Sequence, residues 1–229
     1  MSNLGSMIGI FSALTAGYIG LKYRSLTKNN SFSESYTMIY LLGVIIFSFI
    51  ANMQTTFKLC GKNDYTTAFI ITVIPWTLIL GLLLMLLKSF PGWKAPFSNT
   101  FGYLVAKVMG AGKVIMELNP GTNDTELSKL FKKKVATVIN VHSWPSVQEN
   151  PLKLKKDGKQ KIWTKFTHLV LLKDLIGEMI WYLLAGFLII SYQSSYITNN
   201  SCPAKLDKDG AEVTVDEAAI DKKKTVSKY

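Results

Sequence analysis

The sequence predicts an all-α membrane protein with about four transmembrane helices, a basic extramembrane region and a polar C-terminal tail. Three observations support this fold class. Four stretches approach or exceed the length of about 20 mostly apolar residues that a helix needs to cross a bilayer. The net charge is +11, and most of the basic excess lies between the third and the fourth stretch. The last part of the chain, residues 193–229, is polar and rich in charge of both signs.

The predicted spans are residues 4–21, 36–57, 67–87 and 175–192, the last within the segment 169–192. The first three contain no charged residue, and each is followed directly by a lysine. Buried helices of soluble proteins rarely stay uncharged and apolar on every face for more than 18 residues. The middle two spans therefore have the strongest support, and the count lies between three and five. Residues 1–88 are expected to form a membrane region with three of the spans.

The first span carries small residues at every fourth position, namely Gly5, Gly9, Ala13 and Gly17. This spacing places them on one helix face, where another backbone can approach closely. The ladder therefore predicts tight packing against a partner helix, although glycine is common in membrane helices in any case. In the third span, Pro75 lacks a backbone donor and predicts a bend.

Residues 89–168 are predicted to be a basic region at or outside the membrane surface. From Lys88 to His168 the chain has 14 basic and 5 acidic residues. The turn Phe90-Pro91-Gly92-Trp93 follows the third span, and Trp93 is expected at the lipid headgroups, where tryptophan prefers to lie. The stretch that follows, up to residue 119, is predicted to be an interfacial amphipathic helix. A broken fifth span is the alternative, which Lys107 and Lys113 oppose.

Two further elements are predicted in this basic region. Asn123 and Glu126 resemble a helix cap, and apolar residues recur at helical spacing through residues 122–140. The basic side of this helix consists of Lys132, Lys133 and Lys134. We expect it to contact lipid phosphates rather than nucleic acid, because aromatic residues that could stack on bases are missing. Asp157-Gly158 predicts a β-hairpin turn between strands at residues 152–156 and 159–163.

Four spans place the chain's loops on alternate sides of the membrane. The 22–35 loop and the basic region share one side, and their lysines predict that this side is cytoplasmic. The N-terminus, the 58–66 loop and the tail share the other side. Cys60 and Cys202 lie there together, so an oxidising compartment would permit a disulfide; two free thiols are the alternative. The tail, residues 193–229, is expected to be extended or disordered.

The sequence offers no catalytic, cofactor or metal site and predicts a protein that is not an enzyme. Two histidines and two cysteines have no metal-binding spacing. Residues 110–114 resemble a phosphate-binding loop, but they lack its first glycine and its Ser or Thr. We therefore expect no cofactor.

Glu178 is the one acidic residue in a predicted span, and intramembrane carboxylates are functional candidates. Asp174 lies four residues earlier, on the same helix face, so the pair could serve a proton or cation pathway. However, Glu178 lies only about 5 Å into the span, and the other spans contain no charge to pair with it. The sequence therefore predicts that Glu178→Gln is mild.

The segment Phe90-Pro-Gly-Trp-Lys-Ala-Pro-Phe-Ser-Asn-Thr-Phe-Gly-Tyr-Leu-Val-Ala-Lys107, after the 67–87 span, resembles multi-span membrane proteins of large icosahedral double-stranded DNA viruses of algae and protists. The resemblance covers residues 36–107. Those proteins lie in the lipid layer beneath the capsid. It implies a minor capsid protein that anchors a virion's internal membrane, assembled from a host endomembrane, to the protein shell.

The partners implied are the lipid bilayer and other capsid or membrane proteins, with no specific nucleic acid. The resemblance carries over no individual functional residue, because the motif is not catalytic. Two alternatives remain open. One is a small multi-span transporter or channel subunit of a cellular membrane. The other is a membrane adaptor that recruits a soluble acidic partner through its basic region.

Overall fold

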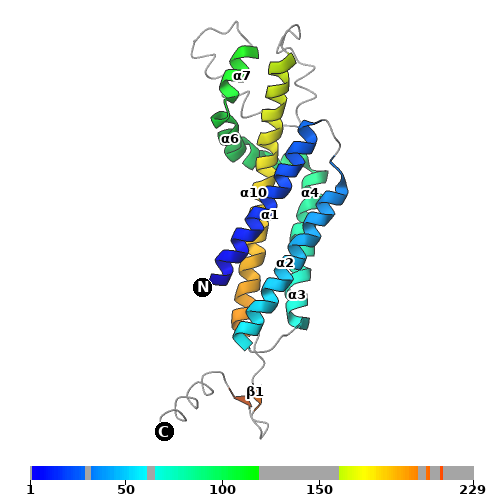
Figure 1. Ribbon diagram of the computed structural model, residues 1–229, viewed down its shortest axis with the longest axis vertical. Coiled ribbons are helices and arrows are strands. Elements are labelled where there is room, and N and C mark those ends of the chain that lie inside the picture. Colours follow the sequence, from blue (N-terminus) through cyan, green and yellow to red (C-terminus); the bar gives the residue numbers. More distant parts are fainter. Residues whose placement is uncertain are drawn as a thin grey trace.

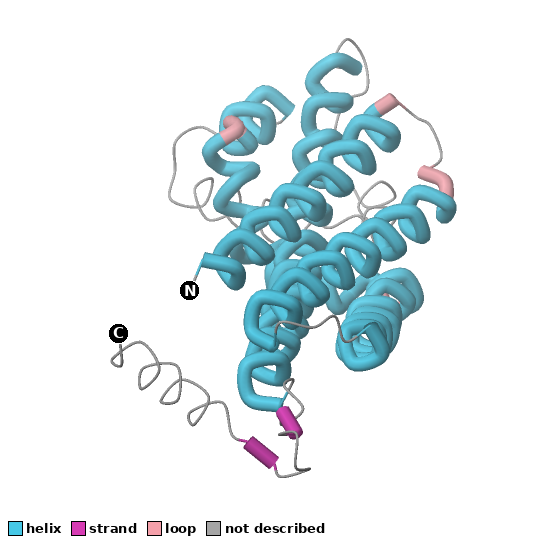
Figure 2. The backbone as a smooth tube through the Cα atoms, turned by 60° about the horizontal axis from the view of Figure 1, so that its bottom comes forward, coloured by secondary structure: helices cyan, strands magenta, loops and turns pink. Residues whose placement is uncertain are grey.

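The computed structural model describes residues 2–28, 32–60, 65–118, 160–200, 205–206 and 212–213. Within these ranges the chain has four helices that are long and apolar enough to cross a membrane, which confirms the predicted number of spans. The four segments are Leu4–Thr27, Glu34–Leu59, Tyr65–Ser89 and Thr164–Asn199. Figure 1 shows them running side by side along the long axis, and Figure 2 shows them gathered into one bundle.

The first two helices, α1 (Ser2–Thr27) and α2 (Glu34–Cys60), are longer than the predicted spans. Helical geometry continues past the apolar stretches because the flanking residues include no glycine or proline until the helices end. α1 turns Phe11, Thr15 and Tyr18 toward the other helices. α2 ends at Cys60, and the pairing of this residue with Cys202 lies outside the part of the chain that the structure describes.

The third span consists of α3 (Tyr65–Pro75), a π-helical turn η1 (Trp76–Gly81) and α4 (Leu82–Ser89). Pro75 has no N–H, so it cannot donate to the carbonyl of Ile71 one turn earlier. That carbonyl instead accepts a hydrogen bond from Nε2 of Gln193 on the fourth span, at 3.0 Å. The proline therefore changes the local helix type and leaves an acceptor that a neighbouring helix satisfies.

A series of short helices follows the third span and packs beside the fourth. These are η2 (Pro91–Lys94), α5 (Ala95–Phe97), η3 (Ser98–Gly102), α6 (Tyr103–Val108) and α7 (Ala111–Leu118). Gly110 joins the last two with φ 90°, a conformation that favours glycine. The prediction of helix in this stretch is confirmed. Ser98, Gly102 and Ala106 are buried along one face.

The fourth span belongs to α10 (Gln160–Asn200), a helix of 41 residues. At 1.5 Å per residue it is about 60 Å long, about twice the hydrocarbon thickness of a bilayer. The prediction of a second strand is wrong for residues 160–163, which belong to the helix. In the turns that follow, Phe166 and Val170 lie four residues apart and are both buried, as one packed helix face requires. The prediction of an extended or disordered tail is wrong for residues 193–200, which are helical. Gln193 and Ile197 are buried there and continue the packed face of α10. The predicted helix at 122–140 and residues 152–159 of the hairpin lie outside the described ranges.

Beyond the bundle, β1 (Lys205–Leu206) pairs with β2 (Glu212–Val213) in an antiparallel two-stranded sheet. Figure 1 shows these strands below the end of α10, at the same end of the bundle as the last turn of α2. The end of α2, at Cys60, and the end of α10, at Asn200, therefore lie at the same end of the bundle. Four spans require this arrangement.

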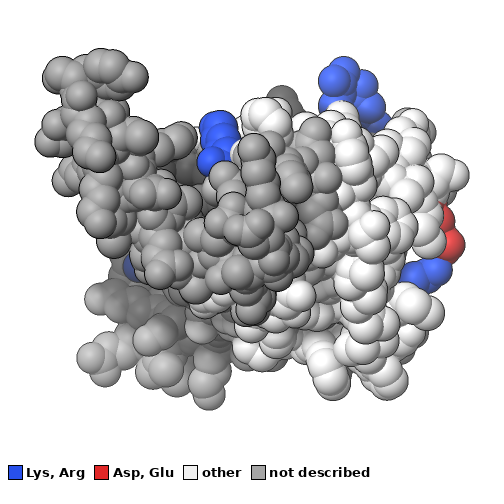
Figure 3. Space-filling view, turned by 90° about the horizontal axis from the view of Figure 1, so that it is seen from below, with Lys and Arg blue, Asp and Glu red and all other residues white. Residues whose placement is uncertain are grey.

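Apolar side chains cover the outside of the bundle, and polar side chains are buried among the apolar ones inside it. Large outward residues are strongly exposed, for example Ile39 (64%), Leu78 (64%), Met85 (68%) and Leu188 (59%). Seen from below, the described surface in Figure 3 shows few charged side chains. At least five polar side chains inside are no more than 2% exposed: Ser48, Asn52, Thr56, Thr72 and Gln193. Such an apolar exterior fits lipid rather than water as the surrounding solvent.

Candidate functional site

At one end of the bundle, each of the four membrane helices has a charged residue at the border of its charge-free stretch. Residues 2–21, 35–57, 65–87 and 179–200 contain no Asp, Glu, Lys or Arg. At this end the four stretches are bordered by Lys22, Glu34, Lys88 and Glu178. All four residues, together with Lys94, line one cavity of about 370 Å³. The helices are therefore in register, with their charge beginning at a common level.

Glu178 is the centre of a buried ion-pair cluster at this level, which we define as Lys22, Lys94, Asp174, Glu178 and Tyr182. Glu178 is 2% exposed. Its Oε1 accepts a hydrogen bond from the ammonium of Lys22 and another, at 2.7 Å, from the hydroxyl of Tyr182. Its Oε2 lies 3.3 Å from Nζ of Lys94. Both oxygens of the carboxylate are therefore paired.

Lys94 joins the two carboxylates of the cluster. Its Nζ lies 2.6 Å from Oδ2 of Asp174, which is 4% exposed. Burial alone would lower the pKa of the Lys94 ammonium, but the carboxylates of Asp174 and Glu178 outweigh burial and raise the pKa above its ordinary value. Lys94 is therefore charged at neutral pH, and two ammonium groups balance two carboxylates.

Helical spacing and close backbone contacts bring these side chains together. Asp174, Glu178 and Tyr182 are four residues apart and share one face of α10. Lys94 reaches this face because η2 and η3 approach α10 at Gly177. A Cβ added to Gly177 would lie 2.7 Å from the backbone nitrogen of Ser98 and 2.9 Å from the carbonyl oxygen of Lys94. Only glycine permits this approach.

Tyrosines form a layer next to the cluster, toward the middle of the bundle. Tyr18 and Tyr40 stack with ring centroids 4.4 Å apart, and Tyr182 packs beside both. The hydroxyl of Tyr40 is 2.9 Å from Oγ1 of Thr15, and the hydroxyl of Tyr18 is 2.9 Å from Oγ1 of Thr37. Each of these buried hydroxyls therefore has a partner, as buried polar groups require.

A second polar set lies toward the other end, beyond an apolar layer. Oγ of Ser48 donates to Oε1 of Gln193 at 2.9 Å, and Nδ2 of Asn52 donates to Oγ1 of Thr72 at 2.8 Å. Along α2, Val44 separates Tyr40 from this set. At the same level the rings of Phe11 and Trp76 pack with centroids 5.3 Å apart, and Val44, Phe11 and Trp76 are each 1% exposed. The two polar sets are therefore separated by packed apolar side chains.

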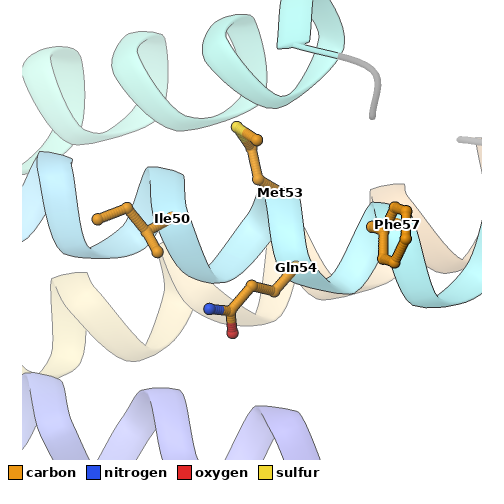
Figure 4. A pocket seen from close by; sticks show the side chains of 4 residues that line it. All are labelled: Ile50, Met53, Gln54 and Phe57. Atoms are coloured by element: carbon orange, nitrogen blue, oxygen red, sulfur yellow. The ribbon is translucent and has the colours of Figure 1, made fainter. Parts of the chain in front are cut away.

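A smaller cavity of about 260 Å³ lies on α2 near its C-terminal end and is lined by Ile50, Met53, Gln54 and Phe57. Figure 4 shows these side chains projecting from a single helix. None of these four can ionise, and Gln54 supplies the polar atoms. This cavity therefore offers less chemistry than the cavity beside the cluster.

The structure places the other predicted site residues as follows. Gly5, Gly9, Ala13 and Gly17 lie on the exposed face of α1, and a Cβ added to any of the three glycines meets no atom within 4 Å. Within the described residues the ladder packs against no helix, so its packing against another chain stays a prediction. Trp93 is 51% exposed, and its carbonyl accepts a hydrogen bond from Nε1 of Trp181 at 2.9 Å. The predicted lipid contacts Lys132, Lys133 and Lys134 lie outside the described residues.

The sequence-based expectation that Glu178 lacks charged partners is wrong. The sequence places Lys22 in the 22–35 loop and Lys94 in the basic region, far from Glu178 along the chain. They reach Glu178 from positions 156 and 84 residues away in the chain. The sequence carries one signal: each of the other three spans is bordered by a charged residue on the same predicted side of the membrane as Glu178. Within the described ranges no group of three or more His, Cys, Asp or Glu side chains gathers as a metal site.

Comparison of the chain with family models, with curated proteins and with solved structures finds no match in any of the three.

Proposed function

We propose that this chain is a non-enzymatic membrane anchor, which holds a basic extramembrane region at one membrane surface. The observation that supports it best is the buried ion-pair cluster. It joins α1, η2 and α10 at the level where the charge-free stretches end. η2 begins the path to the basic region, and α10 returns from it. The cluster therefore holds both attachment points of that region against the spans.

The packing of the bundle favours a static body over a conduit. Buried ion pairs add little net stability, but removing one partner is costly, so they fix which surfaces meet. Phe11, Val44 and Trp76 fill the space between the two polar sets. A pathway for ions or solutes needs polar groups or water along its length. The apolar layer interrupts such a path.

The resemblance at residues 90–107 supports a more specific proposal. The chain would be a minor capsid protein that ties a virion's internal membrane to its capsid shell, with capsid or membrane proteins as partners. The basic region, facing away from the lipid core, supplies the surface for that attachment. Cross-linking in purified particles tests this assignment. We expect links from Lys132, Lys133 or Lys134 to a capsid protein, and absence of the chain from the particles contradicts it.

A small transporter or channel subunit is the second candidate, and one observation favours it. The ion-pair cluster, the tyrosine layer beside it and the second polar set lie inside the bundle, and buried polar groups of this kind are typical of proton and ion pathways. Paired replacement separates the candidates. A static anchor should tolerate Lys22→Gln combined with Glu178→Gln better than Glu178→Gln alone, because both charges of that pair leave together. A transporter that uses Glu178 loses transport in the double variant.

Alkaline extraction of membranes tests the anchor itself. The chain should stay in the membrane pellet, because four apolar helices hold it there. Protease added to sealed, cytoplasm-out vesicles should then cut near Lys132 to Lys134 or near Lys153 to Lys161. Release into the supernatant contradicts the anchor. Full protection of both regions would place the basic region on the opposite side.

A further inference from the structure

We propose that the cavity beside the ion-pair cluster binds the phosphodiester headgroup of a membrane phospholipid. This inference rests on the proposed anchor function, which places the cavity at the bilayer surface. The cavity measures about 370 Å³ and lies between α1, α2, α4, η2 and α10, a volume within the range of ligand sites. Its floor carries the ion-pair cluster, and its mouth carries a second pair, Lys88 with Glu34.

The lysines that line the cavity differ in how many carboxylates they already pair with. Three lysines and two glutamates line it, and Asp174, which pairs with Lys94, brings the number of carboxylates to three, so the charges balance. Lys94 is shared between Asp174 and Glu178, whereas Lys22 and Lys88 each pair with one glutamate. The phosphate is therefore assigned to Lys22 and Lys88. Their side chains are 21% and 70% exposed, against 14% for Lys94.

Lys22 and Lys88 have donors to offer. A lysine ammonium has three N–H donors. Among the described residues, Lys22 donates to Glu178 and Lys88 donates to Glu34. Each therefore keeps donors for a phosphate oxygen without giving up its ion pair. Lys22 is also held 5.9 Å from the ring centroids of both Tyr18 and Phe32, which fixes the direction of its side chain.

Apolar side chains on the same cavity point to a lipid rather than to free phosphate. Leu26, Phe32, Leu84 and Leu87 line it together with the lysines. Leu84 and Leu87 belong to the charge-free stretch that ends at Lys88. A glycerol backbone and the first methylenes of an acyl chain can lie against them while the phosphate reaches the lysines. Basic pockets between membrane helices bind lipid headgroups in this way.

Lipid binding can be measured on the purified full-length chain in an uncharged maltoside detergent, by native mass spectrometry. The probes are dioleoyl phosphatidylglycerol, dioleoyl phosphatidylcholine, dioleoylglycerol and inorganic phosphate. Both phospholipids should bind with one molecule per chain. Dioleoylglycerol, which has no phosphate, and inorganic phosphate, which has no acyl chains, should bind much more weakly.

Two lysine variants make the test specific. Lys88→Gln should weaken phospholipid binding about fivefold, the effect of one basic residue near an anionic lipid. Lys58→Gln is the matched control, because Lys58 is exposed at the opposite end of α2 and should leave binding unchanged. Melting temperatures of both variants should equal that of the wild type, since Lys88 and its partner Glu34 are exposed.

Several outcomes would overturn the proposal. These are equal binding of dioleoylglycerol, equal losses in the two lysine variants, or no phospholipid retained. Inorganic phosphate binding as tightly as phospholipid would make the cavity an anion site and not a lipid site. A chain that stays in the alkaline-extracted pellet but retains no lipid contradicts only this inference. A chain released from the membrane contradicts the anchor function itself.

Discussion

Replacement of Glu178 by glutamine should destabilise the protein strongly. The substitution keeps the size of the side chain and removes its charge. Lys22 then faces a neutral amide in place of its carboxylate partner, and Lys94 keeps only Asp174 as a charged partner. Breaking a buried ion pair by removing one partner costs about 3–5 kcal/mol. Lys22 is partly exposed, with 21% of its side chain accessible, and Lys94 retains one carboxylate, so the lower value of about 3 kcal/mol is expected.

Thermal unfolding in detergent, followed by size-exclusion chromatography with tryptophan fluorescence, measures this loss. For a chain of this size, about 3 kcal/mol corresponds to a fall in Tm of roughly 6–12 °C. Glu34→Gln is the matched control. It also removes a glutamate from an ion pair with lysine at the same end of the bundle, but both side chains of that pair are exposed. It should leave Tm unchanged, because exposed pairs contribute little.

A double variant tests the physical reason for the loss. If the cost comes from a buried ammonium without its partner, then Lys22→Gln combined with Glu178→Gln should recover part of it. The coupling between the two positions should be about 1 kcal/mol or more. The reasoning is refuted if Glu178→Gln melts at the wild-type temperature, or if the two losses simply add.

Two further predictions concern the attachment of the η2–α6 segment to α10. Gly177→Ala should lower the free energy of unfolding by about 1–3 kcal/mol, because its Cβ would lie 2.7 Å from the backbone nitrogen of Ser98. Gly43→Ala, where a Cβ meets no atom within 4 Å, should be neutral or slightly stabilising in the same unfolding assay; equal effects would contradict the close approach. The second prediction uses pH. The carboxylates raise the pKa of Lys94 above its ordinary 10.5, so the stability it contributes is complete below pH 10.5 and is lost as the pH rises through the raised value. The difference in Tm between wild type and Lys94→Gln should therefore close in that alkaline window, and a constant difference would contradict the role of Lys94.

The spans could be predicted from sequence because the signal is local. A stretch such as residues 36–57 is uncharged over its whole length, and no alternative fold buries such a helix easily. The ends were less predictable, since a helix does not stop where the membrane does. α10 shows this most clearly, because it continues 15 residues before Leu175 and eight after Tyr192. Its N-terminal part is polar in places, but it packs against α6 and α7, which periodicity within one segment does not reveal.

The candidate site could be predicted only in part. The pairing of Asp174 with Glu178 on one face follows from their spacing, and the structure brings both to Lys94. The sequence could not show that Lys22 and Lys94 pair with Glu178, because an ion pair between residues 22 and 178 depends on how the two helices are aligned along the bundle. Register is set by contacts such as Gly177 against Ser98 and Gly186 against the ring of Phe11. In the sequence these glycines look like any others in membrane helices.

Pro75 and Gln193 explain why polar residues occur so deep in the bundle. In a bilayer no water can satisfy a free backbone carbonyl, so a proline in one span creates a need for a donor in another. Gln193 meets that need at the carbonyl of Ile71, and its own side-chain carbonyl then accepts a hydrogen bond from Ser48. The resulting network links α2, α3 and α10 near the end opposite to the ion-pair cluster. α10 is thus joined to its neighbours by polar contacts at both ends and by apolar packing between them. This arrangement suits a body that keeps one shape while it holds the basic region at the membrane surface.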